Sequence, residues 1–188
     1  DLFPIISTNE LPLRIGADGN GENRFVGEIG RARVYNRALK AEEAAALARK
    51  QPGALERDPA LVADWKFDNA KQDNQKNTTF ANALGDFLPA RAMGEVAVVD
   101  WPGGKAVRLE GKGFLEVAND PRLQIQKNCT LEAWIKPGKL PANGGRILDK
   151  CRVGTANGYM IDLFPGNALR LIVEWGSLQA NTGTAADQ

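Results

Sequence analysis

Residues 24–39 read RFVGEIGRARVYNRAL and carry the clearest indication of the fold. An alternating stretch runs to Tyr35, a polar turn follows at Asn36 and Arg37, and an Ala/Glu-rich stretch begins near Leu39. Alternation of apolar and polar residues predicts a half-buried strand, and the Ala-rich stretch predicts a helix. The segment therefore reads as the end of a β-rich domain, although it stands near the start of the chain.

Composition indicates an ordinary globular protein. The 188 residues are 43% hydrophobic and 25% charged, with a net charge of +1. This balance gives neither the basic surface of a nucleic-acid-binding protein nor an acidic tail. No apolar run is long enough to span a membrane, so we expect no membrane insertion. Because the chain begins at Asp1 without a visible signal peptide, we expect a processed or excised product.

Histidine is absent from the sequence, and there are two cysteines, Cys129 and Cys151. The absence of histidine excludes Ser-His-Asp and Cys-His catalysis as well as His-ligated metal sites. Two cysteines alone cannot build a zinc site, which leaves one disulfide or two buried thiols.

Short segments rich in β-forming residues dominate the chain, and Gly, Asn, Asp or Pro separates them. Many short strands with turns between them predict a sandwich or a jelly roll. The predicted strands are residues 13–17, 25–35, 61–67, 95–99, 106–109, 114–117, 130–136, 146–150, 158–164 and 168–175. One helix is predicted, at residues 38–50, with Ala44, Leu47 and Ala48 on the stripe that faces the sheet edge.

Several of these segments resemble laminin-G-like domains of the concanavalin A-like jelly-roll superfamily. Residues 61–69 (LVADWKFDN) resemble the opening strand of the family, and residues 103–120 (GGKAVRLEGKGFLEVAND) resemble the stretch that follows it. Residues 129–139 (CTLEAWIKPGK) are similar to the signature around a strand tryptophan. Residues 13–47 resemble the closing strands and the terminal helix. The resemblance implies an all-β fold, a two-sheet antiparallel jelly-roll sandwich with one short helix.

The order of the segments is rotated relative to the family. The closing segment is residues 1–50, a linker-like stretch is 51–59, and the opening and middle strands are 60–188; the hairpin that the family places between them is not found. The chain either straddles two tandem copies or forms one permuted sandwich. We favour one compact sandwich, because two strands and a helix could not bury their own apolar face. The strand ending at Tyr35 should then lie beside the strand that starts at Leu61.

Superfamily members include glycanases, so acidic pairs are the first candidates for chemistry. Hydrolysis of a glycosidic bond needs two carboxylates about 5–9 Å apart. Glu132 and Glu174 each lack an acidic residue two positions on, and no Glu-x-Asp-x-Glu motif occurs. We therefore expect solvated acidic positions and no catalysis.

Tryptophans are the next candidates, because sugars stack on exposed rings. Trp65 and Trp175 alternate with apolar residues and are expected in the core. Trp101 lies on a predicted turn and is the tryptophan expected to be most exposed. Trp134 shares a strand face with Glu132: either this face points outward and binds a ligand, or, as we favour, Trp134 packs against the opposing sheet.

Arg31, Arg33 and Tyr35 alternate on one face of the closing strand. They either bind an anionic sugar or line a solvated sheet face, and the second interpretation is favoured. The resemblance also implies a structural Ca²⁺, and the oxygen-rich loop that contains Asp68, Asn69, Asp73 and Asn74 is the candidate site. The acidic pair that the family often carries in the closing strand is missing, since residues 27–31 read GEIGR.

The relative position of the two cysteines depends on a predicted hairpin between residues 130–136 and 146–150. If Ala133 pairs with Ile147, Cys129 lies opposite Cys151, and a disulfide is possible at the closer type of antiparallel site. The alternative is two buried thiols one residue out of register. A bridge would fit an oxidising location.

The resemblance implies a non-catalytic accessory module, carbohydrate-binding or structural, attached to a secreted or surface carbohydrate-active enzyme. Its partner would be a glycan or a neighbouring domain of the parent protein, in an extracytoplasmic location. The alternatives are a glycoside hydrolase or polysaccharide lyase of the same superfamily, and a protein-binding adhesion module.

Overall fold

The computed structural model describes residues 5–49, 57–139, 144–154, 157–164, 168–174 and 176–183. Its strands are β1 (Leu13–Ile15), β2 (Val26–Tyr35), β3 (Leu61–Trp65), β4 (Ala70–Gln72), β5 (Thr78–Asn82), β6 (Gly85–Trp101), β7 (Gly104–Val117), β8 (Thr130–Pro137), β9 (Gly145–Asp149), β10 (Tyr159–Leu163), β11 (Ala168–Val173) and β12 (Gly176–Gly183). The helices are α1 (Ala41–Ala48) and the short 3-10 helix η2 (Pro121–Leu123). The expected all-β fold with one short α-helix is confirmed.

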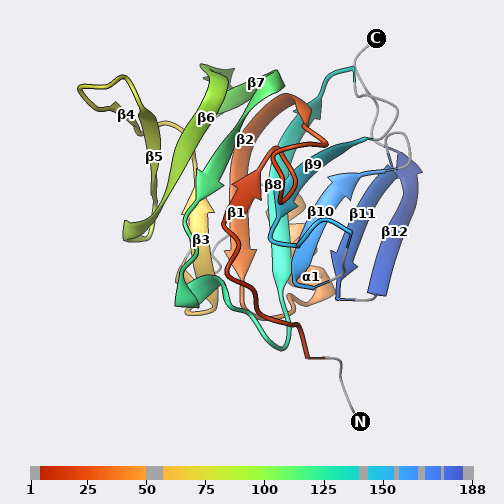
Figure 1. The fold of residues 1–188 in the computed structure, drawn as a ribbon. Coiled ribbons are helices and arrows are strands. Elements are labelled where there is room, and N and C mark those ends of the chain that lie inside the picture. The colour runs from red at the N-terminus through yellow and green to blue at the C-terminus, as the bar shows by residue number, and fades with distance from the viewer. Residues whose placement is uncertain are drawn as a thin grey trace.

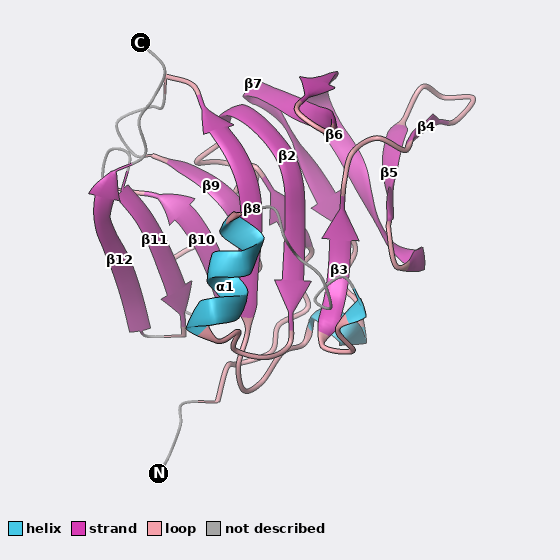
Figure 2. Ribbon diagram, turned by 180° about the vertical axis from the view of Figure 1, so that it is seen from behind, coloured by secondary structure: helices cyan, strands magenta, loops and turns pink. Residues whose placement is uncertain are grey.

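The named strands pair antiparallel and form a sandwich-like arrangement (Figure 1). Hydrogen bonds join all twelve strands into one continuous sheet, which folds over so that two layers can be distinguished. One layer is the main path of the sheet, with the order β12-β11-β10-β9-β1-β7-β6-β5-β4. The other is built on β2, which pairs with β8 along one edge and with β3 and β7 along the other. Figure 2, from behind, shows α1 lying over β8 on the outside of this second layer.

Strand β2 is the centre of the second layer and joins distant parts of the sequence. Its last residues pair with β3, with Val34 opposite Ala63. From Gly27 to Tyr35 it pairs with β8, with Ala32 opposite Ala133 and a register shift between Ile29 and Arg31. The expected neighbours, the strand ending at Tyr35 and the strand starting at Leu61, therefore lie side by side.

The long hairpin β6–β7 connects the two layers. The end of β7 pairs with β1 in the first layer, and its middle pairs with β2 in the second. The pairing of β6 with β7 shifts register between Gly94 and Val96. Gly94 has a φ of +75°, and a Cβ atom there would lie 2.4 Å from the carbonyl oxygen of Lys112, so only glycine fits this bulge. One continuous strand, β7, takes the place of the two predicted strands 106–109 and 114–117.

The core lies between the two layers and contains side chains from both ends of the chain. Ile15 of β1, Val34 of β2, Trp65 of β3 and Leu148 of β9 belong to one buried cluster, each with no exposed surface. The indole Nε1 of Trp65 donates to the carbonyl oxygen of Leu88 at 2.9 Å, which satisfies its polar atom inside the core.

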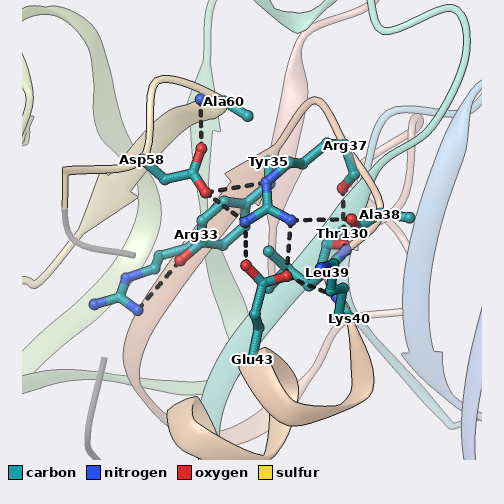
Figure 3. A network of polar contacts seen from close by, with 10 residues as sticks. All are labelled: Arg33, Tyr35, Arg37, Ala38, Leu39, Lys40, Glu43, Asp58, Ala60 and Thr130. Atoms are coloured by element: carbon teal, nitrogen blue, oxygen red, sulfur yellow. Dashed lines mark hydrogen bonds and ion pairs between the residues drawn. The ribbon is translucent and has the colours of Figure 1, made fainter. Parts of the chain in front are cut away.

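Helix α1 is shorter than predicted and is held by polar contacts at its N-terminal end (Figure 3). The guanidinium of Arg37 donates to Glu43 at 2.7 and 2.8 Å and to Asp58 at 3.0 Å. The Thr130 hydroxyl of β8 accepts from the backbone N–H of Leu39 and donates to the carbonyl oxygen of Arg37. The hydrogen bonds from Arg37 lower the pKa of Glu43 to about 2. Of the predicted apolar stripe, only Leu47 is buried, whereas Ala44 and Ala48 are exposed.

The predicted hairpin between β8 and β9 is wrong, and with it the predicted disulfide. Strand β8 pairs with β2, whereas β9 pairs with β1 and β10 in the other layer. Because the connection crosses between layers, the register that would set Cys129 opposite Cys151 does not exist. Both cysteines are free thiols, and burial raises the pKa of Cys129 to about 11 and that of Cys151 to about 12.

Candidate ligand-binding cleft

The outer face of the second layer carries polar and aromatic side chains from β2 and β8. Leu131, Ala133 and Ile135 pack against the core, so Trp134 and Glu132 on the same strand point outward. The favoured interpretation, in which Trp134 packs against the opposing sheet, is therefore wrong, and the binding-face alternative has the correct geometry.

A cleft of about 310 Å³ opens on this outer face. The turn of the β6–β7 hairpin, the end of α1 and the residues after β3 complete its walls. It is lined by Gly30, Arg31, Arg33, Leu47, Lys66, Asp68, Trp101, Pro102, Gly103, Gly104, Lys105, Glu132 and Trp134. Five of the six predicted ligand-binding residues lie in this one cleft. A hollow of this size, lined by two indole rings and six charged side chains, is large enough to hold a small ligand.

The floor of the cleft is a row of charges across three adjacent strands. Arg33 of β2 lies in register with Glu132 of β8 on one side and Asp64 of β3 on the other. Its Nη1 donates to Glu132 at 3.0 Å, and its Nε lies 3.4 Å from Asp64 Oδ1. Arg33 is only 1% exposed, so its charge is compensated by these carboxylates rather than by water.

Arg31 strengthens this row with a two-point ion pair. Its Nε and Nη2 donate to the two oxygens of Asp64 at 2.8 and 2.6 Å. Asp64 is 3% exposed and has a second anchor, because its backbone N–H donates to Asn82 Oδ1. Both arginines are thus committed to carboxylates of the protein itself, which disfavours the earlier alternative that they bind an anionic sugar.

The two tryptophans of the cleft are held in fixed orientations. The indole N–H of Trp134 donates to Glu132 Oε1 at 3.1 Å. Trp101, predicted on a turn, is the last residue of β6. It lies against Gly30 of β2, where a Cβ atom would stand 2.4 Å from the ring atoms Cε2 and Nε1. The absence of a side chain at position 30 therefore lets the indole lie close to the strand. Trp101 is half-buried, less exposed than the sequence predicts.

Lys66 and Asp68 lie at the wall of the cleft, two residues apart after β3. Neither side chain makes an ion pair or hydrogen bond with any residue that the structure describes, in contrast to Arg31 and Arg33. Lys66 is half-buried and Asp68 is exposed. They are the cleft's available donor and acceptor for a ligand. Sequence reasoning missed Lys66, although alternation already placed it on the face opposite Trp65 and Phe67.

Two predicted positions have other roles. Tyr35 has no exposed surface and receives a weak contact from Arg33 at 3.4 Å, so it supports the cleft from below and does not touch a ligand (Figure 3). Glu174 is 6% exposed and accepts from the backbone N–H of Ser7, which makes it an internal anchor instead of a solvated acid. Trp175 lies outside the described residues.

The predicted calcium ligands have different surroundings in the structure. Asp68 lines the cleft, and both Asp73 oxygens accept hydrogen bonds from Asn77 of the β4–β5 turn, at 2.8 and 2.9 Å. The side chain of Asn69 is paired with the backbone of Ala81. No group of three or more acidic, histidine or cysteine side chains suited to a metal occurs in the part of the chain that the structure describes. The side-chain oxygens of Asn69 and Asp73 are thus engaged by other groups of the protein, whereas that of Asp68 faces the cleft.

A second hollow of about 330 Å³ adjoins the cleft between α1 and β8. It shares Leu47, Glu132 and Trp134 with the cleft. The remaining lining is mostly apolar: Leu39, Ala44, Ala48, Thr130, Leu131 and Ala133. The indole of Trp134 therefore stands between a charged cleft and an apolar hollow.

An ion-pair network on β9, β10 and β11 was not predicted. Asp162 is 2% exposed and accepts from Arg170 at 2.6 and 3.0 Å and from Arg146. Arg146 also lies 3.3 Å from Asp149, whose pKa burial raises to about 6. The pairing of β9 with β10 brings these residues together, and cross-strand registers of this kind cannot be read from a sequence. The network links three adjacent strands of the first layer.

Comparisons with protein-family models, with curated proteins and with solved structures find no match for this chain. Within the described residues, no helix is long and apolar enough to cross a membrane.

Proposed function

We propose that the chain is a non-catalytic carbohydrate-binding module and that the cleft on β2 and β8 holds the sugar. The observation that carries the proposal is that Trp101 and Trp134, from distant parts of the chain, line one cleft together with charged side chains. Aromatic rings offer a flat apolar surface to the C–H face of a sugar, and side-chain donors and acceptors satisfy its hydroxyl groups.

The geometry of Glu132 favours binding over hydrolysis. Both of its oxygens are engaged, one by Arg33 at 3.0 Å and the other by Trp134 at 3.1 Å. A glycosidase acid or nucleophile must instead present an oxygen to the scissile bond, opposite a second carboxylate. Glu132 thus orients the indole of Trp134 and compensates the charge of Arg33.

The resemblance to laminin-G-like domains supports the wider part of the proposal. The segments that resemble the closing, opening and middle strands of that family meet in one layer as β2, β3 and β8. A module of this kind would belong to a secreted or surface carbohydrate-active enzyme outside the cytoplasm. It would bring the glycan to a neighbouring catalytic domain.

Binding of soluble polysaccharides by isothermal titration calorimetry tests the proposal. Trp101→Ala and Trp134→Ala should each weaken binding about tenfold, the equivalent of ~1.4 kcal/mol for one lost stacking surface. Phe87→Ala is the matched control, because Phe87 is a half-buried aromatic residue outside the cleft. If the bound polysaccharide is held equally by wild type and both tryptophan variants, the cleft is not the site.

A further inference from the structure

Cationic and anionic side chains in and beneath the cleft are equal in number, and this equality indicates which charge a ligand can carry. Four cationic and four anionic side chains line the cleft or pair with residues that do: Arg31, Arg33, Lys66 and Lys105 against Asp64, Asp68, Asp100 and Glu132. Lys105 is paired with Asp100 at 2.6 Å, and both are exposed, at 48% and 93%. Only Lys66 and Asp68, one of each sign, have no partner of their own among the described residues.

A balanced set of this kind gives an anionic ligand no net electrostatic gain. A carboxylate or sulfate that approached Lys66 would also approach Asp68, two residues away and of opposite charge. An anion at Arg31 or Arg33 would have to compete with the buried carboxylate of Asp64. Sites for anions instead gather several uncompensated cations or backbone N–H groups.

Neutral hydroxyl groups fit the same pair well. Each hydroxyl group is one donor and two acceptors, so two adjacent hydroxyl groups can donate to a carboxylate and accept from an ammonium group at once. Lys66 offers only donors, and an ionised Asp68 offers only acceptors. Both lie in the wall of a cleft that also contains two indole rings.

We infer that the ligand is a neutral glycan and that Lys66 and Asp68 bind two neighbouring hydroxyl groups of one sugar ring, which stacks on the cleft's tryptophans. This inference rests on the proposed function and names the class of glycan. The row of Asp64, Arg33 and Glu132 serves as a rigid floor that places the indole of Trp134. Lys66 and Asp68 supply the specificity for the sugar, since a hydrogen bond to a charged group is among the stronger hydrogen bonds in proteins.

The experiment is calorimetric titration of the whole chain with neutral probes, xylan, galactomannan and mixed-linkage glucan, and anionic probes, alginate and dextran sulfate. Each titration is made at low and at high NaCl concentration. We expect a neutral probe to bind, with an affinity that salt changes less than twofold, because no net charge is screened. Lys66→Met and Asp68→Asn should each weaken that binding about tenfold. Lys71→Met and Asp86→Asn, exposed positions outside the cleft, should leave it unchanged.

The outcomes separate the two proposals. Binding of alginate or dextran sulfate alone, lost at high salt, would overturn the neutral class and leave glycan binding in place. Binding of a neutral probe that Lys66→Met and Asp68→Asn do not weaken would overturn the role of this pair. Binding of no probe would overturn the proposed function together with this inference. An unchanged thermal unfolding temperature for Lys66→Met and Asp68→Asn would show that these substitutions alter the cleft wall and not the fold.

Discussion

Replacing Asp64 by Asn tests whether the charged floor of the cleft is an essential part of the fold. The substitution keeps the shape of the side chain and removes its charge. Asp64 is 3% exposed and holds Arg31 by two hydrogen bonds, while Arg33, 1% exposed, lies 3.4 Å from it. Breaking a buried ion pair costs about 3–5 kcal/mol, because the remaining charge stays buried without compensation. Since Arg31 is 19% exposed and can turn partly to water, we expect a loss at the lower end, about 3 kcal/mol.

Asp100→Asn is the matched control for this prediction. Asp100 pairs with Lys105 at 2.6 Å, the same distance as the shorter Arg31–Asp64 contact, but it is 93% exposed. Exposed pairs contribute less than about 1 kcal/mol, so this variant should unfold almost as the wild type does. Urea denaturation of both variants, followed by fluorescence, measures the difference. Equal midpoints for the two variants would refute the view that burial makes the Asp64 contacts strong.

Three further predictions concern other parts of the molecule. Burial raises the pKa of Asp149 from 3.8 to about 6, so the folded state binds this proton more tightly than the unfolded state between those values. The stability of the wild type should therefore fall as pH rises through this window. The free energy of unfolding of Asp149→Asn should rise by about 2–3 kcal/mol relative to that of wild type between pH 3.5 and 7. Parallel curves of unfolding free energy against pH for the two proteins would contradict this. Thr130→Val removes the hydroxyl that bonds the backbone N–H of Leu39 and should cost about 1–2 kcal/mol in urea denaturation, whereas a Thr130→Ser variant should keep most of the stability. Cys129 and Cys151 should resist alkylation at pH 8 in the folded protein, and both should be alkylated after unfolding without reductant. Intact-mass analysis would show both outcomes. If neither cysteine is alkylated after unfolding, the two form a disulfide.

The elements that alternation could predict are those with one apolar and one polar face. Strands β2 and β3 fall within the predicted ranges, and β8 exceeds its range by one residue, because apolar residues alternate with polar ones along much of each strand. Strands β4 and β5 were missed, since AKQ and TTFAN carry almost no apolar alternation. The first half of β6 was missed because Pro89 and Gly94 read as breakers, although the structure accommodates both in a long hairpin.

The sequence allowed most residues of the cleft to be predicted individually, but it did not allow us to predict that they lie together in one cleft. Trp134 and Glu132 share a face by period two, and Arg31 and Arg33 share another, so each strand's outward set could be read. That these sets adjoin depends on the register of β2 with β8, and that Trp101 joins them depends on the packing of the distant end of β6 on Gly30. Such contacts join residues far apart in the sequence, and no local pattern encodes them. The assumed β8–β9 hairpin failed for the same reason.

The most direct test of the account is an NMR titration that follows the indole N–H signals of the four tryptophans while a neutral oligosaccharide is added. We predict that the signals of Trp101 and Trp134 shift in a saturable manner. The signal of Trp65, whose N–H is bound to Leu88 in the core, should stay in place. Saturable binding of the sugar that leaves the signals of Trp101 and Trp134 unmoved would contradict the central claim that this cleft is the carbohydrate site.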